Sequence, residues 1–369
     1  MYHQINFFNW YYKNSKKLAL KSFLKKYNIK IKNKGGGSEM KRTLGKSGIE
    51  VSALGLGCWP IGGEWKTSNG GTMRFGKIDD VESIKAIQRA VDLGVNFFDT
   101  ADIYGRGHSE ILLGKALKGI RNKVVIATKF GYSFDEVTKE DKGINYSSEY
   151  IKKACIDSLR RLNTDYIDLY QLHLWEIPLE DAKGVFNTLE DLKKEGLIRS
   201  YGWSTDHPQC IDFLIKNTNA VAIQHQFNIL INADKILKIC NDYNIASINR
   251  SPLGMGLLSG KFNKDTVISK DDIRGNNIDW MMYFKDGKPN YIFLEKLDKV
   301  REILTSNGRT LAQGALAYLW AKSEKTIPIP GFTSIKQVEE NAKAMEFGPL
   351  KKNEVEEIET IIGERISIV

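Results

Sequence analysis

The stretch VNFFDT at residues 95–100 sets the pattern from which the fold is predicted. It is a short, mainly apolar run with a carboxylate, Asp99, near its end, and it lies between two longer segments whose apolar residues have helical spacing. A continuous apolar run of this length is typical of a strand buried on both faces, as in a parallel sheet. The same alternation of strand and helix repeats along the chain from Met40 onward.

Eight such runs predict strands at residues 51–57, 95–100, 124–129, 166–173, 198–204, 221–226, 245–249 and 326–330. Helical spacing predicts helices at 79–93, 109–117, 148–162, 179–195, 208–216, 233–243, 293–306 with 311–322, and 335–344. Thr310 with Gln313, and Ser334 with Gln337, match the capping box at two helix starts. Eight strands, each followed by a helix, predict a single (β/α)8 TIM barrel of the α/β class. Turn residues in 41–50 predict a short N-terminal β-hairpin that closes the barrel floor.

The positive charge of the chain is concentrated in residues 1–39. The formal net charge is +9. Residues 1–39 hold nine lysines and one acid, a balance of +8, which leaves +1 for the remainder. A body this close to neutrality gives no support for a nucleic-acid partner.

Three interpretations of residues 1–39 stay open. The segment could form a basic amphipathic helix on an anionic membrane or a partner, or it could be a targeting segment, although it is rich in lysine rather than arginine. Alternatively, the DNA that encodes Lys34 to Met40 can contain a purine-rich ribosome-binding sequence shortly before the Met40 codon. Met40 would then be the true start of translation. We therefore expect a basic extension at 1–39 that is disordered or not natively translated, followed by the barrel at 40–369.

Hydropathy and the cysteines indicate whether the protein binds a membrane or a metal and where in the cell it is found. No apolar run approaches the ~18 to 20 residues that span a bilayer, so no membrane partner is expected for residues 40–369. The four cysteines show neither a CxxC pair nor metal-ligand spacing, so no metal is expected. Reduced thiols and a cytoplasmic location are the expectation. The oligomeric state is not predicted.

Three predicted strands end in ionisable groups. Asp99 ends the second strand and is followed by Tyr104, Lys129 ends the third, and His173 ends the fourth. Catalytic groups of a barrel come from these strand ends. A buried lysine needs a counter-ion, which Asp99 can provide. Since a positive charge favours the phenolate, we expect the pKa of Tyr104 to be lowered and its hydroxyl to act as a general acid or base.

Each of these residues alone has an ordinary structural explanation, such as a structural ion pair or a half-buried aromatic. Their joint occurrence at successive strand ends favours a site. Long loops at 62–78, 131–146 and 253–290 are the predicted walls of its pocket. Trp59 precedes the first of these loops, Trp65 lies in it, and Trp280 lies in the last. The three indole rings could stack on a sugar, although a place in the core or in the pocket wall is the more common role of such residues.

The residues lie in strings that resemble the aldo-keto reductases. The strings are FFDTADIYG, ATKFG and LYQLH, with LGKSGIEVSALGLGCW near the start and IPIPGFTSIKQVEEN near the end, so the resemblance covers residues 40–369. It implies that Asp99, Tyr104, Lys129 and His173 form the catalytic tetrad. In that scheme Tyr104 gives its proton to the developing alkoxide, Lys129 held by Asp99 tunes Tyr104, and His173 orients the carbonyl.

The resemblance also implies a nicotinamide cofactor across the barrel mouth, NADP(H) in the first place and NAD(H) as the alternative. No GxGxxG follows a strand, so a Rossmann fold is not indicated. In chain order, the implied residues would contact first the carboxamide, then the nicotinamide and the pyrophosphate, and last the adenosine phosphate and the adenine. The implied residues are Ser204, Thr205, Gln224, Arg250, Ser251, Pro252, Leu253, Gly254, Gly331, Thr333, Gln337 and Asn341.

The sequence departs from the family pattern at three of these positions. Thr205 stands where asparagine is common, and Arg250 stands where many members have an aromatic residue that stacks on the nicotinamide. A guanidinium plane can also stack, so Arg250 is compatible with that role. Thr333 stands where a basic residue often grips the 2′-phosphate, which leaves Lys336 as the nearby cation.

The predicted function is NAD(P)H-dependent reduction of a small aldehyde or ketone, including sugar-derived carbonyls, to the alcohol. Two alternatives stay open. One is an aldose or polyol dehydrogenase that runs the same site in reverse, and the other is a cofactor-binding regulatory protein with little turnover. A barrel hydrolase is disfavoured because no two acids lie at adjacent strand ends. The loops that select the substrate do not identify it.

Overall fold

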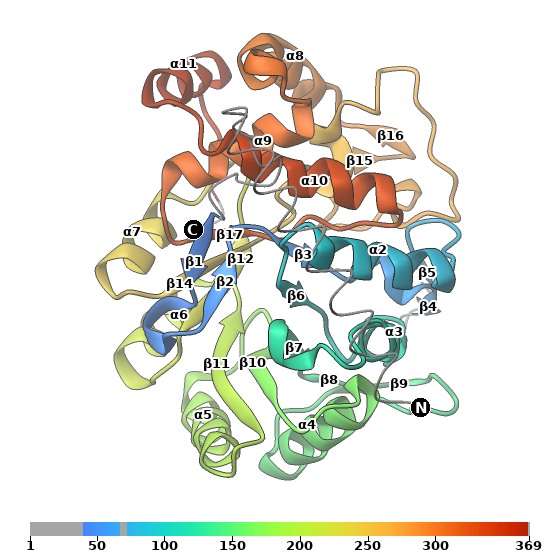
Figure 1. The fold of residues 1–369 in the computed structure, drawn as a ribbon, viewed down its shortest axis with the longest axis vertical. Helices are drawn as coiled ribbons and strands as arrows, with labels where there is room; N and C mark the ends of the chain where they lie inside the picture. Colours follow the sequence, from blue (N-terminus) through green and yellow to red (C-terminus); the bar gives the residue numbers. More distant parts are fainter. Residues whose placement is uncertain (1–39, 67–71, 368–369) are drawn as a thin grey trace, which may run out of the picture. The chain divides into compact units, whose positions relative to one another are not determined.

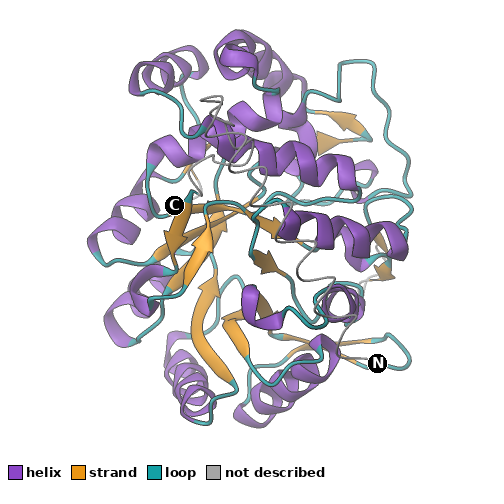
Figure 2. Ribbon diagram, viewed as in Figure 1, coloured by secondary structure: helices purple, strands orange, loops and turns teal. Residues whose placement is uncertain are grey.

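Eight parallel strands form one sheet surrounded by helices in the computed structural model, which describes residues 40–66 and 72–367 (Figures 1 and 2). The predictions for residues 1–39 lie outside this range. The strands, in the order in which they pair, are β17 (Thr326–Pro328), β14 (Ala246–Arg250), β12 (Ala222–Gln226), β11 (Ile198–Ser204), β10 (Ile167–Leu172), β7 (Val125–Phe130), β6 (Phe97–Asp99) and β3 (Gly55–Gly57). The helices of the described chain are α2 (Asp80–Asp92), α3 (His108–Ala116), α4 (Ser148–Leu162), α5 (Leu179–Lys194), α6 (Pro208–Asn217), α7 (Asp234–Asp242), α8 (Tyr291–Thr305), α9 (Leu311–Lys322), α10 (Ile335–Phe347) and α11 (Lys352–Ile362).

The sheet closes where the first strand meets the last. Gly57 N donates to Pro330 O at 3.0 Å, and Gly57 forms a parallel bridge with Gly331. A Cβ atom at Gly57 would lie 2.8 Å from Ile329 O, so this close approach requires glycine. The prediction of a closed (β/α)8 barrel is confirmed.

A hairpin lies at the amino ends of the barrel strands. Its strands β1 (Lys41–Thr43) and β2 (Glu50–Ser52) pair in antiparallel orientation. Leu44, Ile49 and Val51 of the hairpin are buried in one apolar cluster with residues of the barrel interior. The barrel residues of this cluster are Phe97, Val125, Ala127, Leu169, Val221, Ala222, Ala246, Ile248, Ile327 and Ile329. The predicted floor hairpin is therefore present.

The first predicted strand, residues 51–57, is wrong as a single element. The chain turns after Ser52, whose amide donates to Asn96 Oδ1 at 2.6 Å and whose hydroxyl donates to Leu54 O at 2.6 Å. These side-chain hydrogen bonds replace the ladder of a continuous strand. As a result β2 belongs to the floor hairpin and β3 to the barrel.

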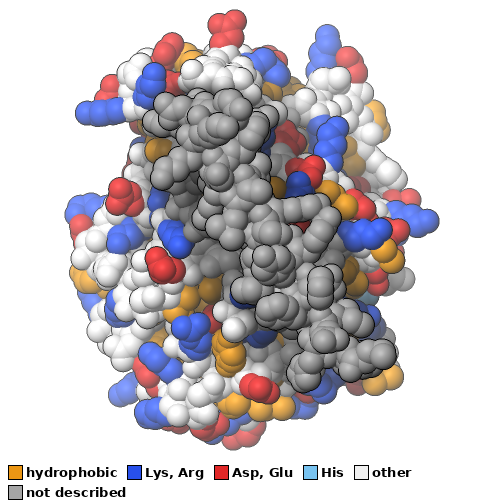
Figure 3. All heavy atoms as spheres, viewed as in Figure 1, with side chains coloured by type: hydrophobic (Ala, Val, Ile, Leu, Met, Phe, Trp, Pro, Cys, Tyr) orange, Lys and Arg blue, Asp and Glu red, His pale blue; other side chains and the backbone are white. Residues whose placement is uncertain are grey.

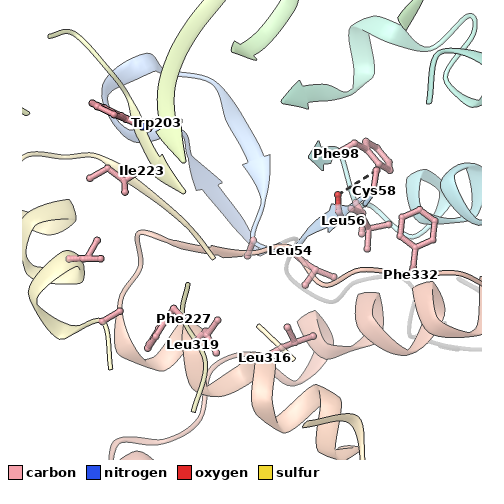
Figure 4. Close-up of a cluster of buried hydrophobic side chains, with 14 of the residues drawn as sticks. Leu54, Leu56, Cys58, Phe98, Trp203, Ile223, Phe227, Leu316, Leu319 and Phe332 are labelled. Carbon is pink, nitrogen blue, oxygen red and sulfur yellow. Dashed lines mark hydrogen bonds between the residues drawn. The ribbon is translucent and has the colours of Figure 1, made fainter. Parts of the chain in front are cut away.

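A second apolar cluster fills the space between the barrel and its helices. Figure 4 shows Phe98, Trp203 and Ile223 from the strands, with Leu316 and Leu319 from α9. The start of α9 is fixed by the predicted capping box of Thr310 and Gln313. At α10 only half of the predicted box forms: Ser334 Oγ accepts from Gln337 N at 3.4 Å, but Gln337 Oε1 accepts from Thr333 N instead of the Ser334 amide.

Several short elements were not predicted because two- to four-residue strands carry too little periodicity to be detected. The hairpin of β8 (Tyr132–Phe134) and β9 (Asp141–Ile144) lies in the predicted loop 131–146, and β15 (Phe284–Lys285) pairs with β16 (Lys288–Pro289) in 253–290. Helix α11 was also missed.

The surface charges, the apolar length of the helices and the cysteines limit the possible partners of the protein. Basic and acidic side chains are interspersed on the coloured part of the visible face (Figure 3). Among the described residues, no helix is both long and apolar enough to cross a membrane. The four cysteines are buried and free, and within 40–66 and 72–367 no group of three or more His, Cys, Asp or Glu residues is placed to hold a metal ion.

Candidate active site

A buried ion pair lies at the carboxyl ends of β6 and β7. Lys129 Nζ donates to Asp99 Oδ1 at 2.5 Å and to Thr100 O at 2.8 Å, and both side chains of the pair are at most 2% exposed. Asp99 Oδ2 accepts from Gln224 at 2.7 Å and from Gln171 at 3.2 Å. The predicted Asp99–Lys129 pair is thus present, and its carboxylate is fully hydrogen-bonded, which offsets the cost of burial.

Gln171 was not singled out from the sequence. It lies two residues before His173 in the string LYQLH, so both side chains lie on the same face of the strand. A polar amide inside an otherwise apolar run was the available signal, because such a group must find a partner when buried.

Tyr104 lies in the turn after β6, and its hydroxyl accepts from Lys129 Nζ at 3.2 Å. The turn is compact: Gly105 has φ +60°, and a Cβ atom there would lie 1.8 Å from Gly62 O. Burial raises the pKa of Tyr104, and the opposing effect of Lys129 does not outweigh it. The expected lowering is therefore wrong in sign, because desolvation of the phenolate exceeds its stabilisation by the lysine.

His173 follows β10 and packs edge-on against Tyr104, with 5.7 Å between ring centroids. Burial lowers the pKa of His173 well below its usual value, and the charges of Lys129 and Arg250 lower it further. The imidazole is therefore neutral at pH 7 and retains one N–H donor. Its Nδ1 is buried and has no hydrogen-bond partner in the described part of the chain.

Tryptophan side chains form a wall beside Tyr104. The rings of Trp59 and Trp65 lie nearly parallel to the Tyr104 ring, with centroid distances of 5.9 and 6.2 Å. Trp280, from the long loop 253–290, lies 6.2 Å from Trp59 and is half exposed. The three indoles singled out from the sequence therefore lie in one aromatic cluster, in which Trp59 and Trp65 stack on the Tyr104 ring and Trp280 contacts Trp59.

The residues implied for the cofactor belong to four neighbouring strands of the sheet or follow them. Ser204 ends β11, Gln224 lies within β12 and Arg250 ends β14, while the others follow β11, β14 or β17. They therefore form one arc along the barrel mouth. Ser204 is buried at the end of β11. Thr205 is used locally, since its hydroxyl donates to Trp175 O at 2.5 Å and accepts from His207 N at 2.9 Å. Its side chain holds the loop rather than presenting a donor to the mouth.

Arg250 is held at the mouth by a residue that was not predicted. Its guanidinium forms an ion pair with Asp206, which is fully buried, and lies 5.7 Å from the centroid of the Trp175 ring. Asp206 Oδ1 also accepts from Gln226 N at 2.6 Å. The pair fixes a planar cation at the end of β14. The signal in the sequence was an acid directly after Ser204 and Thr205.

The turn after β14 contains Ser251, Pro252, Leu253 and Gly254. Ser251 and Gly254 have φ values of +51° and +54°, and Asn228 Nδ2 donates to Ser251 O at 2.9 Å. The last group of implied residues follows β17. Gly331 lies at the barrel seam, Thr333 donates to Gln337 through both its amide and its hydroxyl, and Asn341 is buried on α10.

A closed parallel barrel with a buried lysine–carboxylate pair beside a phenol at its mouth is the arrangement that the sequence strings implied. The model of the aldo/keto reductase family matches residues 53–362. The chain belongs to the aldo-keto reductase family, whose members are oxidoreductases.

Three known proteins illustrate the relationship. An aldo-keto reductase of Schizosaccharomyces pombe, whose name specifies NADP(+), is 33% identical over 314 residues, or 82% of this chain and 84% of that protein. The structure of aldo-keto reductase AKR11C1 from Bacillus halodurans matches with a TM-score of 0.72 at 30% identity, covering 89% of this chain and 98% of that one. The glycerol dehydrogenase AKR11B4 of Gluconobacter oxydans matches with a TM-score of 0.72 at 28% identity, covering 88% and 95%.

Proposed function

We propose that the protein reduces an aldehyde or ketone to the alcohol with a nicotinamide cofactor, and that Tyr104 is the general acid. The observation that carries the proposal is the chain of contacts from Asp99 through Lys129 Nζ to the Tyr104 hydroxyl, at 2.5 and 3.2 Å. A bound reduced nicotinamide supplies a hydride. Tyr104 supplies the proton, so the carbonyl gains one C–H and one O–H bond.

The roles of the neighbouring residues follow from their charges. A raised pKa keeps Tyr104 protonated before the reaction, and the fixed charge of Lys129 stabilises the phenolate once the proton has left. Asp99 holds Lys129 in place and does not reach the substrate. The neutral His173 donates a hydrogen bond that orients the carbonyl oxygen.

The mouth fits a nicotinamide dinucleotide along the arc from Ser204 to Asn341. Arg250, fixed by Asp206 and Trp175, offers a flat surface for the nicotinamide ring, and the ordered turn at 251–254 offers backbone groups for the pyrophosphate. The name of the yeast relative supports NADP(H) as a cofactor here.

Tyr104→Phe tests the proposal because it removes one oxygen and keeps the ring. We expect turnover to fall by roughly 10² to 10⁴-fold, the usual contribution of a general acid, while the Kd of the cofactor stays unchanged. Tyr201→Phe is the matched control, since its buried hydroxyl donates to Glu190 on the outer side of β11. Wild-type turnover in Tyr104→Phe would remove that residue from the mechanism.

A second candidate is oxidation of a polyol or aldose by the same site. Trp59 and Trp65 beside Tyr104, with Trp280 next to Trp59, suit the apolar face of a sugar, and one structural relative is a glycerol dehydrogenase. A screen of aldehydes, ketones, polyols and sugars, followed by nicotinamide absorbance in both directions, distinguishes the two. Binding of cofactor without turnover on any substrate would favour a regulatory protein.

A further inference from the structure

The first turn of α10 is already occupied by acceptors from the protein itself. Glu82 Oε1, from the first turn of α2, accepts from Ile335 N at 2.9 Å. Ser334 Oγ accepts from Gln337 N at 3.4 Å, and Gln337 Oε1 accepts from Thr333 N at 2.7 Å. A helix N-terminus otherwise offers these amides to an anion. Here the Glu82 carboxylate already accepts a hydrogen bond from one of these amides.

The charges around this turn also oppose an anion. Residues 331–341 contain one cation, Lys336, and two acids, Glu339 and Glu340. Arg89 of α2 is close to α10, but it forms an ion pair with Glu339 at 2.8 Å. Together with Glu82, the segment therefore carries a net negative charge where the family pattern would have a basic residue at position 333.

We infer that Glu82 is a specificity-determining residue that weakens binding of the cofactor's 2′-phosphate, so that the protein binds NADPH and NADH with similar affinity. The inference rests on the proposed function, in which the dinucleotide lies along the arc to Asn341, with its adenosine at the start of α10 as the family resemblance implies. A 2′-phosphate competes with the Glu82 carboxylate for the Ile335 amide and is repelled by it. The 2′-hydroxyl of NADH is neutral and can donate to the same carboxylate.

Equilibrium titration of the full chain without substrate tests the inference. Tryptophan fluorescence or calorimetry gives the Kd of NADPH and of NADH at low ionic strength. For the wild type we expect the two values to agree within about fivefold. Glu82→Gln should tighten NADPH by roughly 3- to 10-fold, the effect of one charge at a helix end, and leave NADH unchanged. The gain should shrink as salt screens the charge.

Glu346→Gln is the matched control, because it removes an exposed carboxylate from the last turn of α10, away from the first turn. It should leave the ratio of the two Kd values unchanged. Thr333→Arg, which does not alter the Glu82 hydrogen bond, should tighten NADPH alone, and it serves as the second test should Glu82→Gln fail to fold.

Three results would overturn the inference: a wild type that prefers NADPH by 50-fold or more, an equal effect of Glu82→Gln on both cofactors, or no NADPH gain from Thr333→Arg. Failure of the wild type to bind either dinucleotide would instead overturn the proposed function. Tight binding of both cofactors with a ratio unmoved by Glu82→Gln would leave the proposed function in place and remove Glu82 from it.

Discussion

At the floor of the barrel, Leu44, Ile49 and Val51 pack on apolar side chains of the strands, whereas at the mouth β6 and β7 carry Asp99 and Lys129. The floor gains stability from burial alone. The mouth holds a charge pair that costs free energy to bury and is kept by its hydrogen bonds. The same short strands therefore carry stability at their amino ends and chemistry at their carboxyl ends.

Lys129→Met should have the largest effect, because it should lower both the stability of the protein and its turnover. It leaves the Asp99 carboxylate buried without its cation, which costs about 3 to 5 kcal/mol of unfolding free energy, and it removes the charge beside Tyr104. We expect turnover to fall at least ~10²-fold. Urea unfolding and steady-state rates measure the two effects.

The double variant Asp99→Asn with Lys129→Met separates the two effects. It removes both charges, so most of the lost stability should return while turnover stays low. Recovery of turnover in the double variant would show that the lysine serves only to balance Asp99.

Leu44→Ala is the corresponding change at the floor. The side chain is fully buried, and its truncation should lower the free energy of unfolding by about 3 kcal/mol through lost burial and the cavity left behind. The kcat should stay at the wild-type value. Lys46→Ala, on the exposed turn of the same hairpin, should change stability by less than ~0.5 kcal/mol. A large fall in kcat for Leu44→Ala would contradict the separation of floor and mouth.

The smallest effect concerns pH. His225 lies on β12, and its Nε2 is 2.7 Å from Ser247 Oγ. Burial lowers the pKa of His225 to about 4, against ~6.5 in an unfolded chain. Since the unfolded state takes up the proton first, the free energy of unfolding is highest above pH 6.5 and falls as the pH drops toward 4, by roughly 2 to 3 kcal/mol.

His225→Asn should flatten this fall, as measured by urea unfolding between pH 7 and pH 4. His173 has a lowered pKa as well, so part of the slope should persist. His108→Asn, which removes a half-exposed imidazole beside Asp80, is the control for the loss of an imidazole outside the barrel interior. An unchanged slope in His225→Asn would exclude that residue as a source of acid sensitivity.

The sequence contains enough information for the barrel but not for its fine geometry. Long segments such as α4 and α9 begin and end at the predicted residues, since a capping side chain marks the start of each. Helix α4 also has one apolar face, whereas α9 is buried around its whole circumference over residues 311–320. The turn at Ser52 was missed because it depends on a hydrogen bond to Asn96, 44 residues away. Such contacts leave no local periodicity.

The candidate site divides in the same way. The Asp99–Lys129 pair was predictable from charge balance at strand ends. The net pKa direction of Tyr104 was not, because it depends on how deeply the ring is buried, which only the packing determines. Asp206 and Glu82 were missed because their partners, Arg250 and the Ile335 amide, come from distant segments.

The floor hairpin closes the barrel at the amino ends of its strands. Leu44, Ile49 and Val51 cover the amino ends of the strands, and the barrel interior next to them is filled with apolar side chains. Under the proposed function, a substrate would therefore approach Tyr104 from the carboxyl ends of the strands. A dinucleotide lying along the arc from Ser204 to Asn341 would bind at that same end, so cofactor and substrate would share one approach to the site.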